Sequence, residues 1–378
     1  MSKQSSFKRA VRQAARQSGQ RYTEARTAMA KGKRVYPAFG HPSARPFDHA
    51  ALKAHLQARY GTRITAMAPI TASGMTYSST LLVQRDDGPD WVARVFSSPA
   101  DKVSRVEGDA EILRFLAAHD FPAERLANDE PVSVLDGSGV IVTEFVEGGR
   151  PTDVLASNTP ATWYEMASLL GRLHALPAAG GAVARDGGSI QPGPGAHDGV
   201  YYIGRPKQNL AAAMSALVSV EDAVAPEGRE KFEWLRDQVE NADDAEGLPE
   251  ALTHGNYNGW AAVGKPGNLV IVGWSGSGRG PRLAALAWLL RTAAARDPTA
   301  IDYINAVVRG YREHIQVTDE ELDRLAGVIN MVPLWMSCGA YQRYVRAGHT
   351  PTLDERGFGW RVEHGKQIAA QAIAALRS

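Results

Sequence analysis

The stretch from Leu252 to Leu290 constrains the fold most, because it combines a predicted hairpin with an entry loop and an apolar helix. Two short apolar runs, Trp260–Val263 and Leu269–Trp274, are separated by Gly-Lys-Pro-Gly-Asn, and these residues favour a tight turn. A loop that reads His-Gly-Asn enters the hairpin. Glycine and proline then precede the apolar run Leu283–Ala294, which predicts a buried helix.

This layout resembles the catalytic segment of the aminoglycoside phosphotransferase and choline kinase family. That segment reads roughly His-Gly-Asp, an Asn five residues later, a hairpin, and Ile-Asp-Trp before an apolar helix. The resemblance places His254 and Asn256 at the catalytic positions, so the catalytic Asp is replaced by an amide. The metal-binding Asn is replaced by Ala261 and the metal-binding Asp by Gly273. The chain therefore keeps the frame of the segment without its reactive side chains.

No neighbouring acid replaces the lost ones, because residues 251–296 contain neither Asp nor Glu. Mg²⁺ prefers hard oxygen ligands, usually one or two carboxylates together with substrate phosphates. We therefore expect no metal site in this segment. Any nucleotide is expected to bind without Mg²⁺.

Upstream, the apolar and β-branched runs 64–72, 77–84 and 91–97 predict three strands of an N-terminal lobe. The resemblance implies that the first turn, which contains Gly74, lies over the phosphates of a nucleotide. It also implies that Arg94, a lone cation on the third strand, holds those phosphates and is oriented by Asp109 on the following helix. From the residues alone, Arg94 reads as an exposed strand residue.

The run 140–148 predicts a strand followed by a hinge, where the resemblance implies that backbone groups of Glu144 and Val146 contact an adenine. Apolar spacing then predicts further helices, including one that starts with a capping box at Thr318 and Glu321 and runs from Asp319 into Met336. Four aromatic residues are expected to line a substrate cleft: Tyr257, Trp260, Trp274 and Tyr341.

Composition is that of an ordinary globular protein, with 378 residues, 44% hydrophobic and 22% charged. The length is sufficient for two lobes with separate cores. No apolar run approaches the roughly 18 residues of a membrane span, and the basic N-terminus lacks the apolar region of a secretory signal. These features predict a cytoplasmic protein. The single cysteine, Cys338, is expected to be a buried apolar residue.

Charge is concentrated at the N-terminus, where residues 1–34 carry a net charge of +9 and the remainder −8. Apolar and basic residues at helical spacing predict a small basic helical arm, joined by a linker over residues 35–46. One interpretation is that the arm docks on acidic clusters of its own protein, such as 240–246. The other is that it attracts RNA, the ribosome or another acidic partner.

The predicted fold class is α+β, as a two-lobed protein-kinase-like fold with a basic helical extension. The N-lobe is expected over residues 47–148 and the helical C-lobe over 149–378. The favoured function is a pseudoenzyme that binds a small molecule, nucleotide or peptide in the cleft without Mg²⁺-dependent phosphoryl transfer. The resemblance makes antibiotic resistance and natural-product biosynthesis plausible settings.

Two alternatives remain open at this point. The first is a divergent ATP-dependent phosphotransferase that takes its acids from elsewhere, for which the candidates are Asp101, Asp109, Asp297 and Glu313. The second is an RNA- or ribosome-associated factor that acts through the basic arm.

Overall fold

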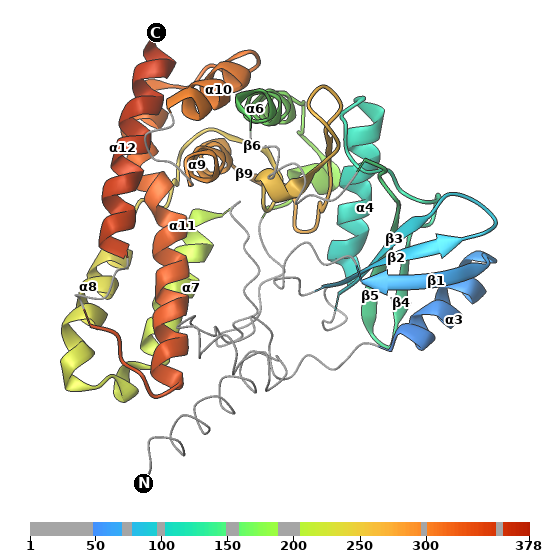
Figure 1. The fold of residues 1–378 in the computed structure, drawn as a ribbon, viewed down its shortest axis with the longest axis horizontal. Coiled ribbons are helices and arrows are strands. Elements are labelled where there is room, and N and C mark those ends of the chain that lie inside the picture. Colours follow the sequence, from blue (N-terminus) through green and yellow to red (C-terminus); the bar gives the residue numbers. More distant parts are fainter. Residues whose placement is uncertain are drawn as a thin grey trace.

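The computed structural model describes residues 48–69, 78–96, 103–148, 159–187, 205–295, 301–352 and 358–378. A sheet-containing lobe lies beside a mainly helical lobe, and the segment from β6 to β9 lies between them (Figure 1). The predicted two-lobed α+β architecture is confirmed. The basic arm, the linker and Gly74 lie outside the described residues.

The N-lobe is built on a five-stranded antiparallel sheet with the strand order β1-β2-β3-β5-β4. Two helices accompany it, and the strand β4 was not predicted from the sequence. The elements are α3 (His49–Tyr60), β1 (Ile64–Pro69), β2 (Ser78–Arg85), β3 (Trp91–Phe96), α4 (Val103–Ala118), β4 (Val132–Leu135) and β5 (Ser138–Glu144).

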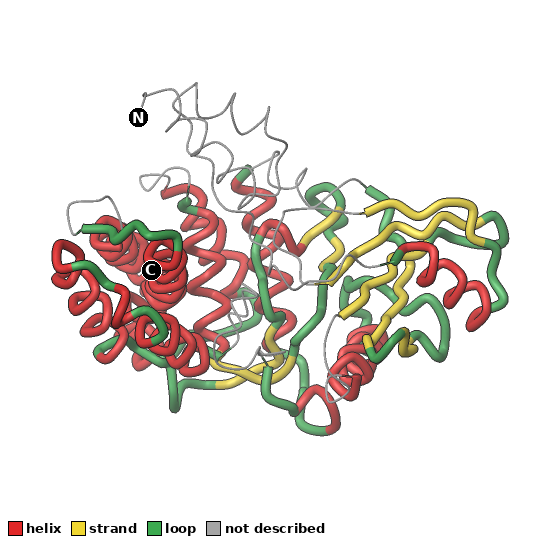
Figure 2. The backbone as a smooth tube through the Cα atoms, turned by 90° about the horizontal axis from the view of Figure 1, so that it is seen from below, coloured by secondary structure: helices red, strands yellow, loops and turns green. Residues whose placement is uncertain are grey.

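Successive side chains along each strand point to opposite faces of the sheet, so the two faces contact different parts of the protein. Trp91, Ala93 and Val95 of β3 belong to a core that includes Leu52 and Leu56 of α3. The intervening residues point to the other face, where Phe96 joins a core shared by α4 and the C-lobe. One apolar core therefore spans both lobes, while α3 and the opposite face of the sheet enclose a second one. Figure 2 shows α3 and the sheet beside the helices.

The C-lobe contains seven helices of eight residues or more within the described residues, and two small sheets. The helices are α6 (Pro160–His174), α7 (Pro206–Val218), α8 (Arg229–Glu240), α9 (Arg282–Ala293), α10 (Ile301–Arg312), α11 (Asp319–Arg346) and α12 (Phe358–Arg377). The strands are β6 (Glu250–Thr253), β7 (Ala262–Val263), β8 (Val270–Ile271) and β9 (Gly278–Pro281). Short 3₁₀ turns lie at Gly181–Ala184, Glu221–Ala223, Pro226–Gly228 and Gly259–Ala261.

Helix α11 begins at the predicted capping box, in which Thr318 and Glu321 cap one another reciprocally. The helix runs through Met336, as predicted, and continues to Arg346. Apolar and aromatic residues keep the helical spacing beyond Met336, since Cys338, Tyr341 and Val345 pack against α7 and α8. Cys338 is buried as expected, and burial raises the pKa of its thiol to about 12.

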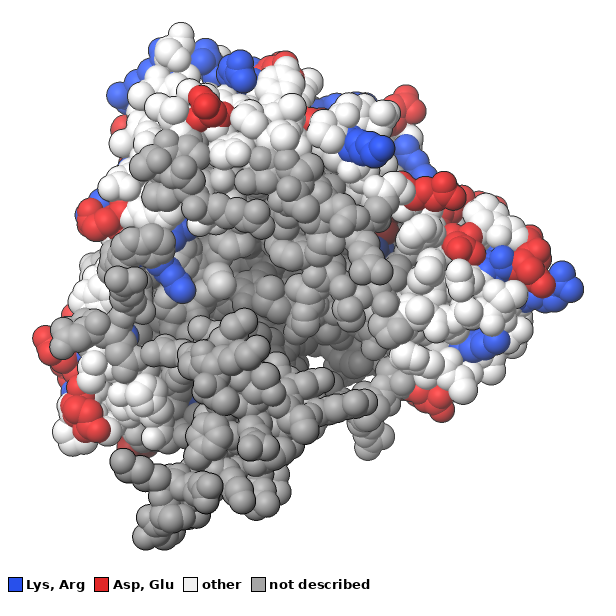
Figure 3. All heavy atoms as spheres, in the orientation of Figure 1, with Lys and Arg blue, Asp and Glu red and all other residues white. Residues whose placement is uncertain are grey.

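No helix in the part of the chain that the structure describes is both long and apolar enough to cross a bilayer. Charged side chains of both signs are interspersed around the rim of the face in Figure 3. Neither sign dominates the described part of this face.

Candidate functional site

The hairpin predicted in the stretch 252–290 is present, although its strands are only two residues long. Ala262 pairs with Ile271 and Val263 with Val270. Gly264 starts the turn with a φ of +115°, and a Cβ there would lie 2.4 Å from the carbonyl oxygen of Asn268. The turn therefore requires glycine at this position.

Glu165 of α6 holds this hairpin against the C-lobe. Its carboxylate accepts hydrogen bonds from the backbone N–H groups of Gly267 and Leu269. At the base of the segment, β6 and β9 pair antiparallel over four residues. The backbone of the segment is therefore anchored at both ends, independently of any ligand.

His254 supports the entry loop from inside the core. Its Nδ1 accepts a hydrogen bond from the N–H of Asn256 at 3.1 Å, and its Nε2 lies 3.1 Å from the carbonyl oxygen of Val272. These partners select the neutral ring with the proton on Nε2. Burial lowers the pKa of His254 to about 4. With 3% of its surface exposed, His254 fixes the loop and does not face a ligand.

The three positions where the family's reactive residues are replaced offer little chemistry. Asn256 is partly buried, and its Oδ1 accepts a hydrogen bond from Asn258 at 2.7 Å. Ala261 is 4% exposed and lies in the core. Gly273 has a φ of +84°, and no atom lies within 4 Å of the position that a Cβ would occupy. Among these positions, only Asn256 carries a side chain that can form a hydrogen bond.

The expected pair of Arg94 with Asp109 is wrong. Arg94 Nη2 donates instead to Glu124 Oε2 at 2.7 Å, in the loop after α4. Alternation puts Arg94 and Thr143 on the face of the sheet toward the C-lobe, where the Thr143 hydroxyl donates to the same carboxylate oxygen at 3.0 Å. Arg94 is also 9% exposed, and so is not the exposed strand residue that its sequence context indicates.

Glu124 is the site residue that sequence reasoning missed. Its second oxygen, Oε1, accepts the backbone N–H of Gly273 at 2.8 Å. This contact depends on long-range pairing, because Ala123 forms a parallel bridge with Ile271 that places the loop after α4 beside β8. The only sequence signal is a lone acid in the otherwise apolar run Phe-Pro-Ala-Glu.

Asp109 is paired with a different arginine, Arg185, which follows the 3₁₀ turn Gly181–Ala184. The same carboxylate oxygen accepts the N–H of Gly276 at 3.1 Å, while Oδ2 is buried without a hydrogen-bond partner. Burial raises the pKa of Asp109 to about 6, although Arg185 acts in the opposite direction. Asp109 therefore contacts the end of the catalytic segment and not Arg94.

Two backbone donors of the hinge are occupied, and one of them is the N–H of Phe145, which donates to the carbonyl oxygen of Asp90 at 2.8 Å. The N–H of Glu144 donates to the carbonyl oxygen of Arg125 at 2.8 Å, so it does not face a ligand. Val146 is partly buried, and its N–H donates to no other described residue. The hinge ends beside the hairpin turn, since a Cβ at Gly148 would lie 3.3 Å from the Cα of Gly264.

Three of the aromatic residues expected in a substrate cleft belong to the core instead. Tyr257 is 1% exposed and its hydroxyl donates to Met166, whereas the indole N–H of Trp274 donates to Ile271. Tyr341 lies in the separate core of α7, α8 and α11. Their polar atoms are satisfied by backbone carbonyls, so their side chains stabilise the fold. The side chain of Trp260 lies outside the described part.

Of the acids proposed as replacements, Asp109 and Glu313 are described, and only Asp109 contacts the segment 252–290, through the N–H of Gly276. Glu313 follows α10 and accepts hydrogen bonds from Tyr164 and Ser168 of α6. Asp101 and Asp297 lie outside the described residues. Within the described ranges, no three His, Cys, Asp or Glu side chains come together in an arrangement that could hold a metal ion.

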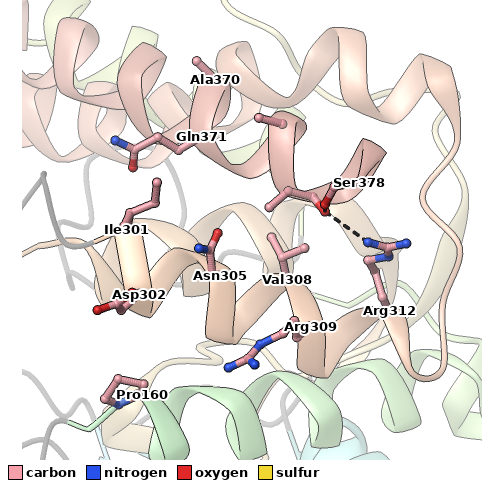
Figure 4. Close-up of a pocket in the computed structure, with 12 residues that line it drawn as sticks. Pro160, Ile301, Asp302, Asn305, Val308, Arg309, Arg312, Ala370, Gln371 and Ser378 are labelled. Atoms are coloured by element: carbon pink, nitrogen blue, oxygen red, sulfur yellow. Dashed lines mark hydrogen bonds between the residues drawn. The ribbon is translucent and has the colours of Figure 1, made fainter.

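A cavity of about 770 Å³ lies between α6, α10 and α12, and none of its lining residues belongs to the catalytic segment. Figure 4 shows Ile301, Asn305 and Val308 on α10 facing Gln371 of α12. Arg312 is tied to the carbonyl oxygen of Ala375 at 3.0 Å. The lining is largely apolar, and it carries no group of side chains suited to catalysis.

Comparison with known proteins identifies the family. The family model described as "Phosphotransferase enzyme family" matches residues 71–326. None of the curated protein sequences matches significantly. Among solved structures, the chain is similar to the amicoumacin kinase hAmiN in complex with AMP-PNP, Ca²⁺ and Ami, with a TM-score of 0.57 and 11% identity, over 86% of this chain and 94% of that one.

Two further structures have the same fold. One is the spectinomycin phosphotransferase APH(9)-Ia, with a TM-score of 0.53 and 12% identity, over 88% of this chain and 99% of that one. The other is a choline/ethanolamine kinase family protein from Mesorhizobium loti, with a TM-score of 0.52 and 16% identity, over 87% and 98%. The expected protein-kinase-like fold is confirmed, and the chain belongs to the phosphotransferase enzyme family.

Proposed function

We propose that this chain is a non-catalytic member of its family, a pseudoenzyme that binds a small ligand between its lobes without Mg²⁺-dependent phosphoryl transfer. One observation carries the proposal. At Gly273, where the resemblance places a metal-binding Asp, the backbone N–H donates to Glu124, and the other oxygen of that carboxylate is paired with Arg94. The carboxylate nearest to this position is therefore committed to protein partners.

The donor set does not fit a magnesium ion. Ala261 and Gly273 have no side-chain oxygen, and the amide oxygen of Asn256 already accepts a hydrogen bond from Asn258. Glu124 is a poor substitute, because a cation bound to it would lie close to the guanidinium of Arg94. Phosphoryl transfer depends almost entirely on positioning and on neutralising charge, and Mg²⁺ supplies much of that neutralisation.

General-base chemistry is also unsupported at Asn256. An amide can accept a hydrogen bond from a hydroxyl group but cannot take its proton near neutral pH. Loss of a general base costs about 10² to 10⁴ in rate. The general base and both metal-binding residues are replaced together, so the contributions of the base and of Mg²⁺ to the rate of phosphoryl transfer are both lost.

The ligand is proposed to be a small molecule, a nucleotide without Mg²⁺, or a peptide. Two of the similar structures contain a nucleotide or analogue together with a small molecule, namely AMP-PNP with Ami and ADP with spectinomycin. The N–H of Val146, which donates to no described residue, is proposed as a backbone donor for a base or another planar ligand at the hinge. Antibiotic resistance, natural-product biosynthesis and a cytoplasmic location remain part of this proposal.

The test is intrinsic ATP hydrolysis in the presence of Mg²⁺, measured for the wild type and for Asn256→Ala. Both proteins are expected to release ADP only at the background rate. Hydrolysis by the wild type that is lost in Asn256→Ala would overturn the proposal. A thermal-shift panel of nucleosides, amino sugars and short peptides is expected to contain a ligand whose stabilising effect is unchanged by EDTA.

A further inference from the structure

We propose that the cavity between α6, α10 and α12 is a second binding site, which takes a small amphipathic acid with an apolar body and one carboxylate. The inference goes beyond the proposed function, because none of the lining residues belongs to the catalytic segment. It does not depend on whether the cleft between the lobes transfers phosphate. It concerns binding alone and requires no chemical step.

The size and lining of the cavity suit a small organic molecule. Its volume of about 770 Å³ lies within the range of roughly 300 to 1,000 Å³ that is typical of ligand pockets. Ile301, at the start of α10, is 50% exposed although its side chain is large and hydrophobic. An apolar ligand would remove this side chain from water. The apolar lining comes from three helices: Pro160 of α6, Ile301 and Val308 of α10, and Ala370, Ala374 and Ala375 of α12.

Two amide side chains interrupt this apolar lining. Figure 4 shows Asn305 of α10 and Gln371 of α12 lying between the two helices. Gln371 Oε1 is buried, and no described residue donates a hydrogen bond to it. Buried polar atoms in folded proteins nearly always have a partner, so a donor from a ligand or from water is expected here. A few polar groups in an apolar lining are typical of a site that orients its ligand.

One cation of the lining has no acidic partner in the described structure. Arg309 is exposed on α10, and it forms no hydrogen bond or ion pair with another described residue. Glu313, which also lies between α10 and α6, accepts hydrogen bonds from the hydroxyl groups of Tyr164 and Ser168 instead. The guanidinium of Arg309 therefore keeps all its donors for a ligand, and a carboxylate is a matching acceptor.

The other charged side chains of the lining are Asp302 and Arg312. Arg312 is held by the end of α12, because its Nη1 donates to the carbonyl oxygen of Ala375 at 3.0 Å. Asp302 precedes Arg309 by two turns of helix, which separates their Cα atoms by about 10 Å along α10. A carboxylate bound at Arg309 is thus kept away from Asp302, and the apolar body of the ligand lies along the remaining lining.

The first experiment is a calorimetric titration of the full chain with octanoate, below the concentration at which octanoate forms micelles. The wild type is expected to bind octanoate at least tenfold more tightly than hexanoate, because two more methylene groups are buried. Ala374→Trp fills the cavity from an exposed position and should abolish binding. The matched control is Gln367→Trp, at an exposed position of α12 outside the lining, which should bind as the wild type does. No binding by the wild type, or equal binding by Ala374→Trp, would overturn the proposal.

A second titration tests whether the ligand is an acid. Arg309→Gln removes the unpaired cation and is expected to weaken octanoate binding about threefold to fivefold, the size of an exposed ion pair. Lys366→Gln is the control, because it removes one positive charge from an exposed position of α12 outside the lining, and should leave the affinity unchanged. Both positions are exposed, so the fold should survive, which the melting temperature checks. Equal affinity in the wild type and Arg309→Gln would contradict the proposed class of ligand.

Discussion

Arg185 of the C-lobe reaches across to α4 of the N-lobe and pairs with the buried carboxylate of Asp109. The guanidinium also donates to the carbonyl oxygens of Arg105 at 2.8 Å and Ser277 at 2.9 Å. Gly108 makes room for it, because a Cβ there would lie 2.1 Å from Arg185 Nη1. One side chain therefore ties α4 to the end of the catalytic segment.

Removing this tie should destabilise the fold. Arg185→Ala leaves Asp109 buried without its cationic partner, and breaking a buried ion pair in this way costs about 3 to 5 kcal/mol. The measurement is the free energy of unfolding in urea at pH 7. As a control, Arg63→Ala removes an exposed arginine from its pair with Asp86 and should cost less than about 1 kcal/mol. Similar costs for both variants would show that Arg185 is not a structural tie.

Asp109 should also give the stability a specific pH dependence. Burial raises its pKa in the folded protein from 3.8 to about 6, so the folded state holds the proton more tightly than the unfolded state. The resulting stabilisation is fully present below about pH 4 and is lost as pH rises through about 6. Its total size is about 3 kcal/mol.

The measurement compares the wild type with Asp109→Asn between pH 4 and pH 7. As pH rises, the wild type should lose unfolding free energy relative to Asp109→Asn. The difference between the two proteins should then become constant above about pH 7. A difference that moves in favour of the wild type over that range would mean that Arg185 lowers the pKa of Asp109 below its ordinary value.

The basic arm gives a prediction that rests on sequence alone. Residues 1–34 carry a net charge of +9, and counterion release favours their binding to a polyanion at low salt. The acidic stretch 240–246, proposed as the docking site of the arm on its own protein, already has basic partners. Asp243 and Asp244 contact Arg324, and Glu246 contacts Lys207. Deleting residues 1–34 should therefore abolish weak, salt-sensitive RNA binding without changing the melting temperature. RNA binding that survives the deletion would contradict the prediction.

Local sequence signals predicted much of the fold. The hairpin follows from its turn residues, the start of α11 from the Thr318 capping box, and the first strands from β-branched runs. Helix α11 continues beyond Met336 to Arg346, and buried Cys338 and Tyr341 lie in this extension.

The ion pairs of the site could not be read from the sequence, because partner choice depends on tertiary packing. Asp109 and Glu124 are both acids near α4, and the backbone bridge between Ala123 and Ile271 decides which of them meets Arg94. The positions of the aromatic residues also depend on tertiary packing, which the sequence does not show. Tyr257 and Trp274 lie in the segment that resembles the family's catalytic segment, but their hydroxyl and indole groups point to backbone carbonyls inside the core.

The proposed site works without magnesium, because Ala261 and Gly273 have no ligand oxygen on their side chains. Calorimetric titration of the wild type with ATP, in EDTA and in millimolar Mg²⁺, tests this claim most directly. The predicted result is the same weak affinity, or no binding, under both conditions. Binding that Mg²⁺ tightens tenfold or more would show that other acids coordinate the metal, and would contradict the account.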